Sequence, residues 1–213
     1  MKDMILYHGS KNGLSGAIKP MSREKCDFGR GFYMGENKNQ ATSLVVELPE
    51  AKVYKLKFNL SQIPEERILT LNDEEWLLAI LANREICMPF NKLSIAHYWK
   101  EKMDDYDVII GKIADDKMQR AVREFVEQNI TDKALVACLK EVDYGNQIVA
   151  KNEFACSLIE VLDEVQVKGQ VRTSAIQFNE SKRSINNRVI KEKQLLYRKS
   201  GLYIDEFVEK YAQ

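Results

Sequence analysis

The order of hydrophobic and polar positions predicts short strands separated by helices. Short apolar or alternating runs bounded by turn residues indicate strands at residues 4–8, 52–60, 106–114 and 147–151. Longer amphipathic stretches indicate helices at residues 38–46, 116–128, 132–142 and 153–162. Asn72 is a suitable cap for a further helix, in which Trp76, Leu77, Ile80 and Leu81 share one apolar face. From about residue 177 the chain has the pattern of a basic amphipathic helical tail.

The spacing of these elements predicts an α+β fold. The strands are unequal and far apart, which does not suit a regular doubly wound sheet and favours a central antiparallel or mixed sheet. A chain of 213 residues with 45% hydrophobic content can bury one good-sized core. We therefore expect one domain over residues 1–165 and a helical C-terminal extension over residues 166–213.

Charge adds one local feature to this picture. The net charge is zero, which gives no global argument for nucleic acid or a membrane surface as a partner. Residues 171–200 nevertheless hold eight Lys or Arg against two Glu. A solvated helix is the simplest interpretation, and docking of a partner is the alternative. The interleaved Leu195, Leu196 and Tyr197 favour a protein surface over bare phosphate, so nucleic acid is only weakly supported.

Cysteine spacing and the N-terminus predict a reduced, cytoplasmic, soluble protein. The four cysteines are far apart and form no C-x-x-C pair, which argues against a zinc site and against a disulfide framework. The apolar run from Met4 to Tyr7 is too short for a signal peptide or a membrane span.

A cluster of glycines and aromatic residues is the first candidate for function. The stretch FGRGFYMG at residues 28–35 contains three of the ten glycines in the chain. Gly29 and Gly31 allow a tight bend, Phe28 and Phe32 can anchor it, and Tyr33 would then face a cleft. The spacing is not that of the G-x-G-x-x-G fingerprint, and a hairpin bulge with aromatic packing is the structural alternative.

Together with other motifs, this cluster carries a resemblance to a known superfamily. LYHGS at residues 6–10, FGRGFYMGE at 28–36, YDVIIGKIADD at 106–116 and a late Gln-Ile strand resemble the ADP-ribosyltransferase superfamily, in its diphtheria-toxin-like and poly-ADP-ribose-polymerase-like branch. The chain is more closely similar to a bacterial family of unknown function assigned to that superfamily, over roughly residues 4–162. The resemblance implies a split mixed or antiparallel sheet core with flanking helices, in which two small sheets hold NAD in a cleft and no metal is needed.

The resemblance also implies roles for individual residues. His8 matches the histidine that bonds the adenosine ribose, the backbone of Gly9 the clamp on the nicotinamide carboxamide, and Tyr33 the tyrosine that stacks on nicotinamide. The remaining members of the implied binding set are Ser10, Phe28, Gly29, Arg30 and Gly31, where Arg30 either faces a phosphate or is a solvated loop arginine.

One position departs from the superfamily pattern. Active members carry a glutamate on a late strand, and the matching residue here is Gln147. A neutral amide can hold the ribose but cannot accept a proton or offset positive charge, and the loss of a general base lowers a rate by roughly 10²–10⁴. Asp115, Asp116 or Glu153 are the candidates for supplying the carboxylate from elsewhere. The structural alternative for Gln147 is an ordinary strand residue whose amide bonds a backbone group.

The leading prediction is a mono-ADP-ribosyltransferase that passes ADP-ribose from NAD to an unidentified acceptor macromolecule. By family analogy it is a bacterial toxin or effector whose neutralising protein partner contacts the C-terminal tail. One alternative is an NAD- or ADP-ribose-binding module that has lost its chemistry at Gln147. Two weaker alternatives are an RNA 2′-phosphotransferase, for which too few basic residues lie near the motifs, and a purely structural interaction protein.

Overall fold

The computed structural model describes residues 2–84, 88–114, 116–141 and 145–211. Its strands are β1 (Met4–Ser10), β2 (Phe32–Gly35), β3 (Lys52–Phe58), β4 (Ile68–Thr70), β5 (Val108–Lys112), β6 (Asn146–Ala150) and β7 (Ile159–Gln166). The four strands predicted from the hydrophobic pattern are therefore present as β1, β3, β5 and β6.

All these strands belong to one mixed sheet, which confirms the α+β class. Their order is β4-β5-β6-β2-β1-β3-β7, and only β4 and β5 are parallel neighbours. β1 pairs with β3 along its whole length but with β2 only at Tyr7 and Gly35. The described strands thus form one sheet and not the two small sheets that the superfamily resemblance implied, and the split lies within this sheet, where β1 and β2 share that single pair.

The helices are α1 (Lys38–Ser43), α2 (Asp73–Arg84), α3 (Met88–Asn91), α4 (Ser94–Asp104), α5 (Asp116–Val126), α6 (Asp132–Glu141), α7 (Glu153–Ser157), α8 (Gly169–Tyr197) and α9 (Ile204–Tyr211). The predicted cap of α2 is confirmed. The side-chain oxygen of Asn72 accepts from the N–H groups of Glu74 and Glu75 at 3.0 Å, and the Glu75 carboxylate accepts from the Asn72 N–H at 3.0 Å. This reciprocal pair is a capping box.

The predicted helix over residues 153–162 is wrong in its second half. α7 ends at Ser157, and Ile159 begins the edge strand β7. The strand is held by residues distant in sequence, since it pairs with β3 throughout and the Lys52 ammonium lies 2.6 Å from the Glu164 carboxylate. Most of its side chains are exposed, so the apolar positions carry no clear period-two signal.

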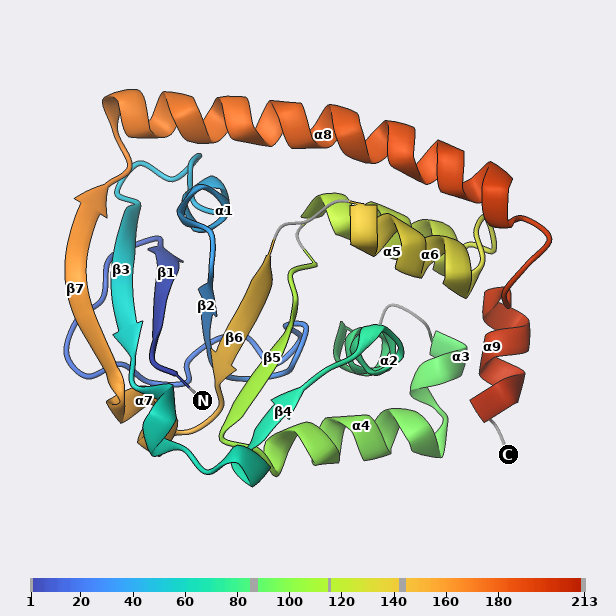
Figure 1. Cartoon of the computed structure of the whole chain (residues 1–213), viewed down its shortest axis with the longest axis horizontal. Helices are drawn as coiled ribbons and strands as arrows, with labels where there is room; N and C mark the ends of the chain where they lie inside the picture. The colour runs from blue at the N-terminus through green and yellow to red at the C-terminus, as the bar shows by residue number, and fades with distance from the viewer. Residues whose placement is uncertain (1, 85–87, 115, 142–144, 212–213) are drawn as a thin grey trace.

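The C-terminal helices pack on the rest of the molecule. α8 begins at Gly169, earlier than predicted, and runs across the top of the view in Figure 1, with α1 under one end and α5 and α6 under the other. Ile204 and Phe207 of α9 are buried in the same hydrophobic cluster as α2, α4 and α5. α8 and α9 therefore share a core with residues before position 165. The division into two domains after residue 165 stays a prediction.

Of the described cysteines, Cys26 and Cys156 are free thiols. Among the described residues, no group of three His, Cys, Asp or Glu side chains is placed to hold a metal ion. None of the helices in the described ranges combines the length and apolar character needed to cross a membrane.

Candidate functional site

The site begins where β1 and β2 separate. Beyond the pair of Tyr7 and Gly35, the strands exchange a side-chain contact, in which His8 Nδ1 lies 2.7 Å from the carbonyl oxygen of Tyr33. A carbonyl oxygen only accepts, so the proton is assigned to Nδ1 and Nε2 is left as an acceptor. Burial lowers the pKa of His8, which keeps the ring neutral, and the ring lies 4.4 Å from that of Phe32.

The glycine-rich bend has the predicted form. Gly29 has a φ of +72°, and the Tyr33 hydroxyl donates to its carbonyl oxygen at 2.6 Å while accepting from the Phe28 N–H at 3.0 Å. Phe28 and Phe32 are both buried. The Tyr33 hydroxyl therefore joins two backbone groups of the bend, and these hydrogen bonds fix the position of the ring without a ligand.

Two of the predicted glycines are required by close packing. A Cβ on Gly9 would lie 2.3 Å from the carbonyl oxygen of Ala41 on α1, and a Cβ on Gly31 would lie 2.4 Å from Val149 Cγ1 on β6. Both positions thus have a structural reason for glycine that is independent of any ligand.

Two cavities meet at Tyr33. The smaller, of about 340 Å³, lies between His8, Phe32 and the loop of residues 13–22. The larger, of about 690 Å³, is lined on its inner side by Tyr33, Asp27 and Gln147. Tyr33 lines both, and each has a volume in the range of ligand pockets, so we take the pair as the candidate site.

The floor of the larger cavity holds a buried polar network. Gln147 Nε2 donates to Asp27 Oδ2 at 2.7 Å and to the Lys112 carbonyl oxygen at 2.9 Å. The other oxygen of Asp27 is paired with the Arg84 guanidinium, which also donates to the Ala114 carbonyl oxygen at 2.6 Å. Burial raises the pKa of Asp27, and the charge of Arg84 acts in the opposite direction.

Neither Asp27 nor Arg84 was among the sequence candidates. Asp27 directly precedes Phe28 in the glycine-rich stretch, and its closeness to that motif was the one signal that could have found it. Arg84 stands in the last turn of α2, where a basic residue suits the helix dipole and signals nothing more.

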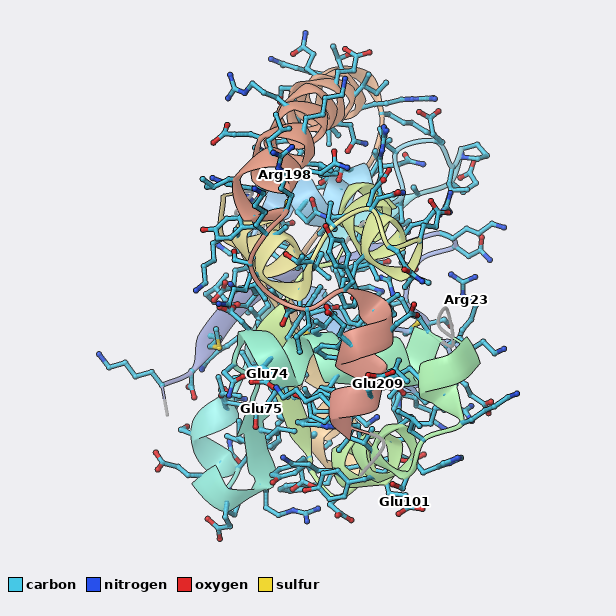
Figure 2. All side chains as sticks on the ribbon, turned by 90° about the vertical axis from the view of Figure 1, so that its right-hand side faces the viewer. Arg23, Glu74, Glu75, Glu101, Arg198 and Glu209 are labelled. Carbon is cyan, nitrogen blue, oxygen red and sulfur yellow. The ribbon has the colours of Figure 1, made fainter. Side chains whose placement is uncertain are left out.

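Basic side chains surround the larger cavity. They come from a loop, from α2 and from α5: Arg23, Lys25, Arg84 and Arg123. Arg23 and Arg123 are exposed, and the side chain of Arg23 extends from the surface of the molecule in Figure 2. Arg84 and Arg123 lie far from the motifs in the sequence, whereas Arg23 and Lys25 shortly precede the glycine-rich stretch and could have been counted with it.

Residues 4–161 match the family model described as Protein of unknown function (DUF3990). The chain belongs to this family. No curated protein and no solved structure matches the chain. The matched region of this DUF3990 protein contains every lining residue of both cavities and ends within β7, so α8 and α9 lie outside it.

Other predicted residues of the DUF3990 protein lie elsewhere. Ser10 donates to the Gly13 carbonyl oxygen at 3.0 Å, and Arg30 is exposed and donates to the Pro20 carbonyl oxygen at 3.2 Å; neither lines the two cavities. Glu153 is exposed at the start of α7, beyond the end of β6 opposite to Gln147. Asp115 lies outside the described residues, and Asp116 begins α5 with a side chain that is not described.

Proposed function

We propose that this protein is a mono-ADP-ribosyltransferase that uses NAD as its substrate. The observation that carries the proposal is the contact of 2.7 Å between His8 Nδ1 and the Tyr33 carbonyl oxygen, which brings two residues far apart in sequence into one cavity. Gln147 lines the larger cavity, which Tyr33 also lines. The three residues named by the superfamily resemblance therefore line two cavities that share Tyr33.

The two cavities suggest how the dinucleotide binds. The adenosine half occupies the smaller cavity, where Nε2 of His8 accepts a hydrogen bond from a ribose hydroxyl. The nicotinamide half occupies the larger cavity against the ring of Tyr33, and the basic side chains there favour the pyrophosphate. Because the Tyr33 phenol is already fixed by Gly29 and Phe28, little ordering of this ring is needed on binding.

In the proposed reaction, the bond between C1′ of the ribose and the nicotinamide nitrogen breaks. Its electron pair passes to the pyridinium ring, which leaves as neutral nicotinamide. A lone pair of the acceptor forms the new bond to C1′, and the proton of the acceptor passes to solvent. The positive charge that develops on the ribose requires an anionic or acceptor-rich surface beside it.

The chain contains two histidines, which provide a matched test. The protein is incubated with labelled NAD and a cell lysate, and labelled product and released nicotinamide are measured. We expect His8→Ala to reduce both by about 10²-fold or more. His97→Ala, which removes an exposed imidazole on α4, should leave both unchanged. Absence of labelled product from the wild-type protein, together with absence of NAD binding in calorimetry, contradicts the proposal.

Calorimetry also separates the transferase from a binding module. A module would bind NAD with a measurable affinity and release no nicotinamide over long incubation.

The basic lining supports a second candidate, the RNA 2′-phosphotransferase. Arg23, Lys25 and Arg123 give the larger cavity the cationic character that a phosphorylated nucleic acid requires. An oligonucleotide carrying an internal 2′-phosphate tests this reading. Removal of that phosphate in the presence of NAD, without labelling of lysate protein, would favour the second candidate.

The C-terminal part of α8 supports the proposed neutralising partner. Leu195 and Leu196 are 70% and 64% exposed, next to the exposed Lys191, Arg198 and Lys199. Apolar residues surrounded by basic ones suit an acidic protein surface with an apolar centre.

A further inference from the structure

We propose that Asp27 and Gln147 act as one unit, in which Asp27 supplies the negative charge of the site and fixes the amide of Gln147. The inference rests on the proposed transferase function. It names the acidic group that the departure from glutamate at position 147 leaves unassigned.

The hydrogen bonds determine which way the Gln147 amide faces. Its nitrogen lies 2.7 Å from Asp27 Oδ2 and 2.9 Å from the Lys112 carbonyl oxygen. A carboxylate and a carbonyl have no proton to give, so only the NH₂ group can face them. Both donors are then used, and Oε1 is the group that remains for a ligand in the larger cavity, which Gln147 lines. It can accept from a ribose hydroxyl as a carboxylate oxygen would.

Asp27 carries the charge that the amide lacks. Asp27 lines the larger cavity while only 6% of the residue is exposed. Arg84 holds one oxygen and Gln147 the other, and Arg84 is itself bonded to the Ala114 carbonyl oxygen. A carboxylate fixed in this way does not reorganise as positive charge develops on the ribose.

The same geometry explains why position 147 is not glutamate. A carboxylate there would face Asp27 and the Lys112 carbonyl oxygen with no proton between them. Two carboxylates in contact cannot both ionise, so one would take up a proton. Gln147 is therefore the residue that matches Asp27, and Gln147→Glu alone is not expected to increase turnover.

The ionisation of Asp27 predicts the acid limb of the pH profile. Burial raises its pKa above the ordinary value of 3.8, against the opposing effects of Arg84 and Gln147. The charged form is therefore lost as the pH falls through this raised pKa, and turnover should fall with it. The other titratable or charged groups around it are Cys26, Tyr33, Arg23, Lys25, Arg123 and Glu127.

The test compares the wild-type protein, Asp27→Asn, Gln147→Glu and the double variant with both substitutions. Nicotinamide release, its pH profile, NAD affinity and melting temperature are measured for each. We expect Asp27→Asn to lower release by about 10²–10³-fold and to change the NAD dissociation constant by less than about threefold. The double variant keeps one carboxylate and one amide but places the carboxylate at position 147 and the amide at position 27. Its nicotinamide release should recover to within about tenfold of the wild-type rate, with a displaced acid limb in the pH profile.

Glu153→Gln, which removes an exposed carboxylate beyond the other end of β6, is the control and should behave as the wild type. Asp27→Asn with wild-type turnover overturns the inference, and so does a folded double variant that is no more active than the single ones. A merely structural ion pair would lower the melting temperature without displacing the acid limb. A wild-type protein that neither binds NAD nor releases nicotinamide is a different result, since it rejects the proposed function itself.

Discussion

Two buried glutamines near the opening between β1 and β2 differ in how their hydrogen bonds are met. Both donors of Gln147 have acceptors, as described above. Gln40, on α1, is 1% exposed, and neither its amide nitrogen nor its amide oxygen has a partner among the described residues. A buried polar group without a partner lowers stability by roughly 1–3 kcal/mol.

We therefore expect Gln40→Met to raise the free energy of unfolding by about 1 kcal/mol, because the thioether has a similar length and no strong polar group to desolvate. Urea unfolding measures the change. Gln62→Met, at an exposed position, should stay within about 0.5 kcal/mol of the wild type. A destabilised Gln40→Met would show that the amide has a partner in solution.

Contacts between elements explain which positions of the glycine-rich stretch require glycine. Gly31 lies where β2 approaches β6 too closely for any side chain, whereas a Cβ on Gly35, at the other end of β2, would make ordinary contacts of 3.6 and 3.9 Å. Neither residue has a positive φ, so the difference between them is one of space alone. They form a matched pair at the two ends of β2, since Gly31 directly precedes the strand and Gly35 is its last residue.

We expect Gly31→Ala to lower the free energy of unfolding by about 1–3 kcal/mol, because Val149 and the backbone of Ala150 must move to accommodate the methyl group. Gly35→Ala should be neutral or stabilise by up to about 1 kcal/mol through the smaller entropy of the unfolded chain. Thermal unfolding of both variants gives the comparison, and equal melting temperatures would contradict the packing argument.

At the scale of the whole molecule, α8 and α9 pack against the rest of the fold and do not project from it as a separate tail. The ring of Phe207 on α9 lies 5.6 Å from that of Phe125 and 6.3 Å from that of Phe90, measured between centroids. Near the start of α2, Glu74 accepts from Lys210 at 2.8 Å and from the Tyr211 hydroxyl, and Figure 2 labels Glu74 on the face of the molecule that α9 covers. α9 is thus held by a buried aromatic group, by the ion pair of Lys210 with Glu74 and by the hydrogen bond of Tyr211.

Phe207→Ala should lower the free energy of unfolding by about 3–5 kcal/mol, since it leaves a cavity in the core that α2, α4 and α5 share. Leu196→Ala removes an exposed side chain of α8 and should change it by less than about 0.5 kcal/mol. Calorimetry of the wild type checks the premise. One cooperative transition is expected, and two separate transitions would instead support independent units on either side of residue 165.

Local sequence patterns predicted those helices and strands that can be recognised without knowing what they pack against. β5 lies in a continuous apolar run, and α2 begins at the Asn72 cap, which the sequence shows within the four residues 72–75. β7 was missed because its strand character comes from pairing with β3, about a hundred residues earlier. The three-residue β4 was missed as well, because it is too short to show a period.

The candidate site, too, has one part that the sequence predicted and another that only the tertiary structure shows. From the sequence, the superfamily resemblance predicted that His8 near the end of β1 and Tyr33 after the glycine-rich bend line one pocket, and both line the smaller cavity. The bend itself could be predicted because the backbone freedom of glycine is a local property. The tertiary structure decided which carboxylate joins them. Asp27, Arg84 and Gln147 come from a loop, α2 and β6, and only folding brings them to one cavity, where their mutual hydrogen bonds fix the orientation of each side chain.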